Sequence, residues 1–170
     1  MLQNNVFVME TSISTQYYLK ALSAYPWSPE EVIEMVAYAL SYDDEYAPSL
    51  CLMGKIQMEY LKDFNTAAHY FNRALIANKN YVETYKQYSL LLIWLGDLNK
   101  AELIIRRAET IKGMDKTLCI MRRATIAELK GDFALAVKFT KLGRQLSLNN
   151  EWYDYFNNEK IRLKRKIKKT

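Results

Sequence analysis

The chain has 170 residues, a net charge of +5 and a composition that is half apolar, enough to form a sizeable core. Five glycines and three prolines are too few for a loop-rich β architecture, and no Gly, Ser or Pro linker divides the chain. The longest apolar run, Ser89 to Leu95, is too short to span a membrane, and the first residues lack the basic and apolar regions of a signal peptide. A cytoplasmic protein is therefore expected.

The positive charge is concentrated at the C-terminal end. Residues 160–170 contain no acidic residue and carry seven basic ones, Lys160, Arg162, Lys164, Arg165, Lys166, Lys168 and Lys169. Removing these 7 from the 24 basic residues leaves 17 against 19 acidic ones, a net charge of −2. The body of the protein is thus close to neutral and its basicity belongs to a tail.

The first predicted helix follows a lead-in, residues 1–11, that has no clear period and is expected to be extended or frayed. Thr11 or Ser12 can cap this helix. It should end near Ala24, because the residue before Pro26 is pushed away from the α region.

A second helix start follows at Ser28. Serine at the N-cap, Pro29 at the first helical position and Glu31 at the third predict a capping box. The helix after it places an apolar set on one face, Val32, Val36, Ala39 and Leu40.

Three helix pairs are expected next, each joined by a short turn. They run over about 48–61 and 64–77, 82–95 and 98–111, and 116–129 and 133–146. The aspartate of each turn can cap the second helix, and Gly96 and Gly131 allow the positive φ that ends the first. A last helix, capped by Asn149-Asn150, begins near Glu151 and ends in the basic tail.

The turns share a pattern, Asp-(Leu/Phe)-x-x-Ala. Its alanines, Ala67, Ala101 and Ala136, lie 34 and then 35 residues apart. A fixed period in this range is typical of stacked helix-turn-helix units, in which each pair has an apolar face that it cannot cover alone. The pattern predicts an all-α protein, a right-handed α-solenoid of about four antiparallel helix pairs with a C-terminal capping helix. The expected organisation is a superhelix over 12–148, with pairs at about 12–46, 47–80, 81–114 and 115–148, and a capping helix with basic tail at 149–170.

The repeat resembles the tetratricopeptide repeat family. The best match is residues 82–114, where the family's positions are taken by Tyr85, Ser89, Leu92, Gly96, Asp97, Leu98, Ala101, Ile105 and Ala108. The copy at 116–148 departs from the pattern at Thr140 and at Gly143, which replaces the last alanine. In the copy at 48–80, Lys62 replaces the turn glycine and the first helix carries one extra residue.

The resemblance implies a concave groove, lined by the first helix of each pair, that binds an extended peptide or a helix of another protein. The implied lining positions are Cys51, Lys55, Met58 and Glu59, then Lys86, Leu90, Ile93 and Trp94, then Met121, Thr125, Glu128 and Leu129. These positions lack the repeated cation and amide clamp that a terminal carboxylate requires, which disfavours acidic chaperone tails as ligands. Their apolar character favours an amphipathic helix or apolar segment. The alternative is that the chain's own N-terminal residues or final helix cover this surface, or that some of these side chains belong to the core.

The resulting hypothesis is a non-catalytic adaptor or scaffold, with an escort chaperone for one client's apolar segment as the alternative. Self-association through an exposed terminal pair, giving a homodimer, is a third hypothesis. The basic tail has the charge to attract nucleic acid, an anionic membrane or an acidic partner. A solvated helix end is favoured, because cations are stable at a helix C-terminus and Ile161, Leu163 and Ile167 form no clean apolar stripe.

No catalytic, metal or cofactor site is expected from the sequence. The single histidine, His69, has no serine, aspartate or metal-spaced partner nearby. Cys51 and Cys119 form no CxxC motif and occupy positions where a small apolar residue fits, so they are expected to be reduced. The mixed side chains on the first helices also lack a repeated polar code, which disfavours base-by-base RNA reading.

Overall fold

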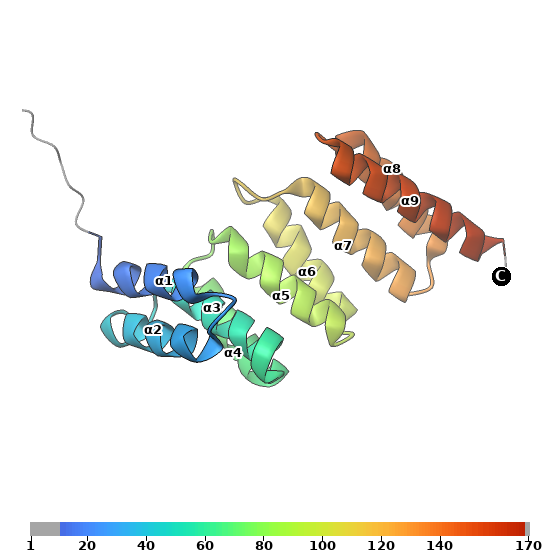
Figure 1. Cartoon of the computed structure of the whole chain (residues 1–170). Helices are drawn as coiled ribbons and strands as arrows, with labels where there is room; N and C mark the ends of the chain where they lie inside the picture. Colours follow the sequence, from blue (N-terminus) through green and yellow to red (C-terminus); the bar gives the residue numbers. More distant parts are fainter. Residues whose placement is uncertain (1–10, 169–170) are drawn as a thin grey trace, which may run out of the picture. The chain divides into compact units, whose positions relative to one another are not determined.

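A computed structural model describes residues 11–168, and all regular secondary structure within that range is helical (Figure 1). The elements are α1 (Ile13–Ala24), α2 (Pro29–Tyr42), α3 (Ala47–Ile56), the π-helix η1 (Gln57–Leu61), α4 (Phe64–Ala77), α5 (Val82–Trp94), α6 (Leu98–Glu109), α7 (Lys116–Leu129), α8 (Phe133–Leu146) and α9 (Asn150–Ile167). The predicted all-α class is confirmed. Of the predicted lead-in, residues 1–11, only Thr11 lies within the described residues. Lys169 of the basic tail lies outside them.

The helices belong to two compact units, one ending at Tyr81 and the other beginning at Val82. In the first unit α1 packs on α2, α2 on α3 and α3 on α4; in the second unit every helix from α5 to α9 packs on the next. The last helix therefore lies against α8, as a capping helix does. The boundary between the units falls where the second and third predicted pairs meet, and a single continuous superhelix over 12–148 stays a prediction.

The predicted caps form at each repeat turn. The carboxylate oxygens of Asp63, Asp97 and Asp132 accept hydrogen bonds from backbone N–H groups three residues later, at 3.0, 3.2 and 2.8 Å. Ser12 and Asn149 cap α1 and α9 in the same way. Because these bonds satisfy backbone donors that a helix start leaves open, the turn residues alone define where the second helices begin.

The capping box predicted at Ser28 does not form. Ser28 occupies the N-cap of α2 and Pro29 follows at the first position, but the serine side chain makes no cap hydrogen bond. The backbone N–H of Ser28 already donates to the Ala24 carbonyl oxygen at 3.0 Å. In a capping box this backbone N–H would donate to the Glu31 carboxylate. Here the turn after α1 already uses it.

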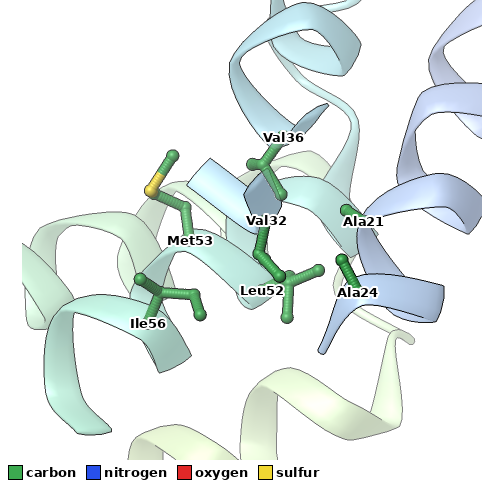
Figure 2. Close-up of a cluster of buried hydrophobic side chains, with 7 residues drawn as sticks. All are labelled: Ala21, Ala24, Val32, Val36, Leu52, Met53 and Ile56. Carbon is green, nitrogen blue, oxygen red and sulfur yellow. The ribbon is translucent and has the colours of Figure 1, made fainter. Parts of the chain in front are cut away.

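The core of the first unit lies where three helices meet. Figure 2 shows side chains from α1, α2 and α3 pointing toward one another, namely Ala21, Ala24, Val32, Val36, Leu52, Met53 and Ile56. In the second unit Ala127 of α7 and Ala136 of α8 cluster with Leu163 of α9. Alanine at these contacts lets the helix backbones approach closely, which is why the repeat pattern requires it.

The extra residue in the copy at 48–80 is accommodated by the π-helix η1. A π-turn holds one residue more than an α-turn, so the insertion widens the helix locally and the following turn at Lys62-Asp63 keeps its geometry. Counted back from the turn, where Lys62 takes the place of Gly96, Met58 occupies the position of Leu92. Leu92 is a core residue, and Met58 is likewise fully buried.

Lys62 adopts the left-handed conformation, with φ 56° and ψ 21°, that glycine adopts at the equivalent turns. In this conformation a non-glycine residue is strained by roughly 1–2 kcal/mol. Replacing it with glycine removes the strain, but part of the gain in stability is lost because glycine has greater conformational entropy in the unfolded state. We expect Lys62→Gly to raise the free energy of unfolding by about 0.5–1 kcal/mol, measured by urea denaturation.

Lys62→Ala and Gly131→Ala are the matched controls for this substitution. Lys62→Ala removes the side chain and keeps the strain, so it should leave stability unchanged. Gly131 has φ 79° and open space around an added Cβ, so Gly131→Ala should lower stability by about 1 kcal/mol through backbone strain alone. Equal stability of the Lys62→Gly and wild-type proteins would contradict the assignment of strain.

Candidate partner-binding surface

The exposed face of α5 and α7, in the second unit, carries most of the predicted groove residues. Lys86, Leu90 and Ile93 recur at i, i+4 and i+7 on α5, with Trp94 beside them, so they share one side of that helix. Trp94 is 54% exposed, whereas Lys86, Leu90 and Ile93 are half-buried.

The corresponding face of α7 follows the same spacing. Met121, Thr125 and Glu128 recur at i, i+4 and i+7, next to Leu129. Leu129 is 57% exposed, and the other three side chains are half-buried. The first helices of two successive pairs, α5 and α7, thus each present one largely exposed apolar side chain with half-buried neighbours.

A buried arginine joins α7 to α5. The guanidinium of Arg122, which is only 7% exposed, donates hydrogen bonds through Nη1 to the Lys86 carbonyl oxygen and to the Ser89 hydroxyl. Burial lowers the pKa of Arg122 to about 10, so it stays charged at neutral pH. Sequence reasoning missed Arg122, although it lies three residues after Cys119 and four before Ile126, on a face of α7 that is buried.

In the first unit, Tyr25 contacts two of the predicted groove residues, Lys55 and Glu59. Its hydroxyl donates to Glu59 Oε2 at 2.5 Å, and Lys55 Nζ lies 4.4 Å from the centre of its ring. Burial, followed by the hydrogen bond to Glu59, raises the pKa of Tyr25. The loop between α1 and α2 therefore occupies this part of the predicted groove.

Two predicted lining residues of the first unit belong to the core instead. Met58 occupies the position of the core residue Leu92, and Cys51 is buried to a similar degree. Assigning Met58 to the groove was wrong, because the equivalent outward position after the inserted residue is Glu59. Neither Cys51 nor Cys119 forms a disulfide bond, and burial raises the pKa of the Cys119 thiol to about 11, so it is not a reactive thiolate.

The C-terminal helix covers the far edge of the α7 face. Glu128 accepts hydrogen bonds from Arg162 Nη1 and Nη2 at 2.6 and 2.5 Å and from Lys166 Nζ at 2.6 Å. Hydrogen bonding, chiefly from Arg162, lowers the pKa of Glu128 to about 2. Arg162 also bonds Glu159 on its own helix. Two tail cations are therefore structural, and Glu128 is engaged within the chain.

The other predicted lining residues of the second unit are half-buried or exposed, and most of them are apolar. We define the α5–α7 face by the residues Leu90, Ile93, Trp94, Met121, Thr125 and Leu129. Within residues 11–168, no three His, Cys, Asp or Glu side chains gather as a metal site would require. None of the described helices is long and apolar enough to cross a membrane.

Comparison with known proteins identifies similar solved structures. PilW, a widely conserved type IV pilus biogenesis factor, is 15% identical with a TM-score of 0.71 over 91% of this chain and 79% of its own. TTC0263, a thermophilic TPR protein of Thermus thermophilus, is 13% identical with a TM-score of 0.70 over 86% and 80%. MamA of Desulfovibrio magneticus, from residue 41, is 12% identical with a TM-score of 0.70 over 88% and 84%. No protein-family model and no curated protein matches the chain.

Proposed function

Because the chain has the tetratricopeptide-repeat fold, we propose that it is a non-catalytic interaction module that binds an amphipathic helix or apolar segment of another protein on the α5–α7 face. The observation that carries the proposal is the exposure of Trp94 beside half-buried aliphatic neighbours. A tryptophan with about half its surface in water and an apolar surround is typical of the anchor residues of protein interfaces.

The exposed anchors set the scale of the affinity. Trp94 and Leu129 are the largely exposed anchors, and covering such a side chain contributes roughly 1.5–3 kcal/mol. A micromolar Kd corresponds to about 8 kcal/mol net of the cost of association, so the ligand must also contact the half-buried neighbours of these anchors to reach it. Met121, two turns before Leu129 on the same face of α7, has a flexible thioether side chain that tolerates ligands of different shape.

The electrostatics of the face favour an apolar ligand over a charged one. Lys86 is paired with Glu83 at 3.3 Å and Glu128 is paired with Arg162, so the charges beside the face are compensated within the chain. A ligand that relied on a terminal carboxylate would meet no convergent cationic donors here. Recognition through buried apolar surface is the consistent alternative.

We expect Trp94→Ala to weaken partner binding by at least about tenfold, because truncation of an interface anchor costs about 2 kcal/mol or more. Affinity capture from the native organism identifies the partner, and isothermal titration with that partner compares the variants. The melting temperature should stay near that of the wild type, since Trp94 is exposed.

Leu103→Ala provides the matched control. Leu103 lies on α6 in the same unit and is 66% exposed, so its loss removes comparable apolar surface away from the α5–α7 face. Binding by the Leu103→Ala protein should equal that of the wild type. If Trp94→Ala binds as tightly as Leu103→Ala, or if it loses binding only by unfolding, the proposal is wrong.

A further inference from the structure

The basic tail divides into two halves with different surroundings. Arg162 and Lys166 lie on the flank of α9 that faces α7, where Glu128 and Glu159 pair with them. Lys160, Lys164 and Lys168 recur at every fourth residue on the other flank. Within residues 11–168 no ion pair joins any of these three lysines to a carboxylate. The second group is thus a row of uncompensated cations spaced by about 6 Å along the helix.

Two cations of α8 border the same row. α8 and α9 pack against one another (Figure 1), with Gly143 against the ring of Phe156. Repulsion from Arg144, then burial, then repulsion from Lys164 and Lys141 lower the pKa of Lys160. We call the group Lys141, Arg144, Lys160, Lys164 and Lys168 the cationic seam.

The seam lies where the repeat would place another helix. α9 packs on α8 as α7 packs on α6, and it reaches back to α7 through Arg162 as α7 reaches α5 through Arg122. α9 therefore stands as the first helix of a pair. Its flank away from α7, the seam side, is where a second helix would pack, and no other helix of the described residues occupies that place.

The chemistry of this place differs from that of the preceding pair. α7 presents Ala127 to its second helix α8, where it clusters with Ala136 and Val137. α9 presents lysines instead, and these would be costly to bury against an apolar helix. An occupant of this place must bring negative charge.

We propose that the cationic seam binds an acidic helix of a protein partner, which docks beside α9 in the place of a second helix. Carboxylates at i and i+4 on such a helix are spaced by the same 6 Å or so as Lys160, Lys164 and Lys168. Lys141 and Arg144 supply a second row on the opposite side of the incoming helix. The charges are therefore complementary in both sign and spacing.

The dimensions of the seam favour a protein helix over nucleic acid. The row from Lys160 to Lys168 extends only about 12 Å, shorter than a duplex site that engages six to ten phosphates. Single strands are bound by exposed aromatic platforms. The aromatic side chain beside the seam, Tyr153, lies under the guanidinium of Arg144, 5.7 Å from its ring centre. The seam thus offers a row of point charges rather than a stacking surface.

The test uses a labelled, alanine-based helical peptide of about 20 residues with glutamate at every fourth position, titrated with the full chain by fluorescence polarisation. Wild-type binding should weaken as salt rises, because the contacts are between exposed charges. The double substitution Lys160→Glu/Lys164→Glu should weaken binding at least tenfold. A peptide of the same composition with its glutamates clustered should bind less tightly than the spaced one.

The matched control is Lys112→Glu/Lys116→Glu, which changes the net charge equally at exposed positions outside α8 and α9. This pair should leave peptide affinity within about twofold of the wild type, and circular dichroism should show both double variants folded. Equal losses in the two pairs would overturn the seam as the site. Tighter binding of a 20-nucleotide poly(dT) strand, or of vesicles containing phosphatidylserine, would overturn the choice of an acidic helix.

The two proposed surfaces are separable by experiment. Trp94→Ala should leave binding of the acidic peptide unchanged, and the Lys160→Glu/Lys164→Glu protein should still bind the partner of the α5–α7 face. A negative result for one surface therefore leaves the proposal for the other surface unaffected. If both surfaces bind, the protein can hold two partners at once, as an adaptor does and a single-client escort does not.

Discussion

Phe156→Ala is expected to lower the free energy of unfolding by about 3–5 kcal/mol, the usual loss for a fully buried phenylalanine. Phe156 is completely buried and is one of the largest such side chains in the described chain. Its ring stacks on Trp152 at a centroid distance of 5.8 Å and packs against α8 at Gly143. Because it anchors the first turns of α9, we expect its loss to detach that helix, seen as reduced helical circular dichroism before the main transition.

Gly143 explains how the ring fits. A Cβ at this position would overlap the ring of Phe156, so Gly143→Ala forces the two helices apart. Alone, this substitution should cost about 1–3 kcal/mol as overpacking. In the Phe156→Ala background the clash is gone, and alanine should stabilise α8 by up to about 1 kcal/mol over glycine.

A reversal of sign is therefore the expected signature of the Gly143–Phe156 contact, and a double-mutant cycle by guanidinium denaturation measures it. Asn158→Ala, at an exposed position of the same helix, should change stability by less than about 0.5 kcal/mol. If Gly143→Ala costs the same with and without Phe156, the two side chains do not share the space that the structure assigns to them.

Acidification is expected to destabilise the docking of α9 through Glu128. The pKa of this carboxyl is about 2 in the folded protein, against an ordinary 4.5, because Arg162 and Lys166 donate hydrogen bonds to its ionised form. Because the pKa of Glu128 is lower in the folded than in the unfolded protein, its ionised form stabilises the folded state. This contribution is complete at pH values above the pKa of the unfolded state. That contribution should disappear as the pH falls from about 4.5 through about 2.

Glu128→Gln tests this ion pair directly. We expect a loss of about 1–2 kcal/mol at neutral pH, moderated by solvent because Arg162 is 42% exposed. The loss should shrink toward zero below about pH 2, where wild-type Glu128 is protonated as well. The difference in unfolding free energy between the two proteins, measured by urea denaturation from pH 7 to pH 2, gives the result.

Glu151→Gln is the control for general acid effects. Glu151 is an exposed carboxylate in the first turn of α9, so its substitution should leave the acid dependence of the wild type largely intact. A Glu128→Gln protein whose stability falls with acid as steeply as that of the wild type would show that other carboxyl groups cause the loss.

The residues that depart from the tetratricopeptide pattern mark the places where the structure deviates from a regular repeat. The extra residue of the third helix became a π-turn, and the lysine in place of a turn glycine became a left-handed residue at Lys62. Gly143, in place of an alanine, makes room for Phe156. Each departure was visible in the sequence. The ring of Phe156, which fills the space beside Gly143, belongs to another helix, and this contact was not predicted.

The helices, their boundaries and their pairing followed from the sequence, because capping residues, turn glycines and the apolar period act over a few neighbouring residues. α4, α7 and α8 begin and end at the predicted residues. Of the predicted apolar face of α2, Val32, Val36 and Ala39 are buried and Leu40 is half-buried. Local chemistry thus determined the fold class and the positions of the helices that carry the candidate surface.

Which side chains stay exposed was decided only by the tertiary structure. Met58 was buried in the core, Glu59 was covered by Tyr25, and Glu128 was bound by Arg162. The last two contacts join residues 34 apart, so they depend on how separate helices pack rather than on any local pattern. The same packing splits the basic tail into a neutralised flank and an uncompensated one, because a helix presents opposite sides to different neighbours.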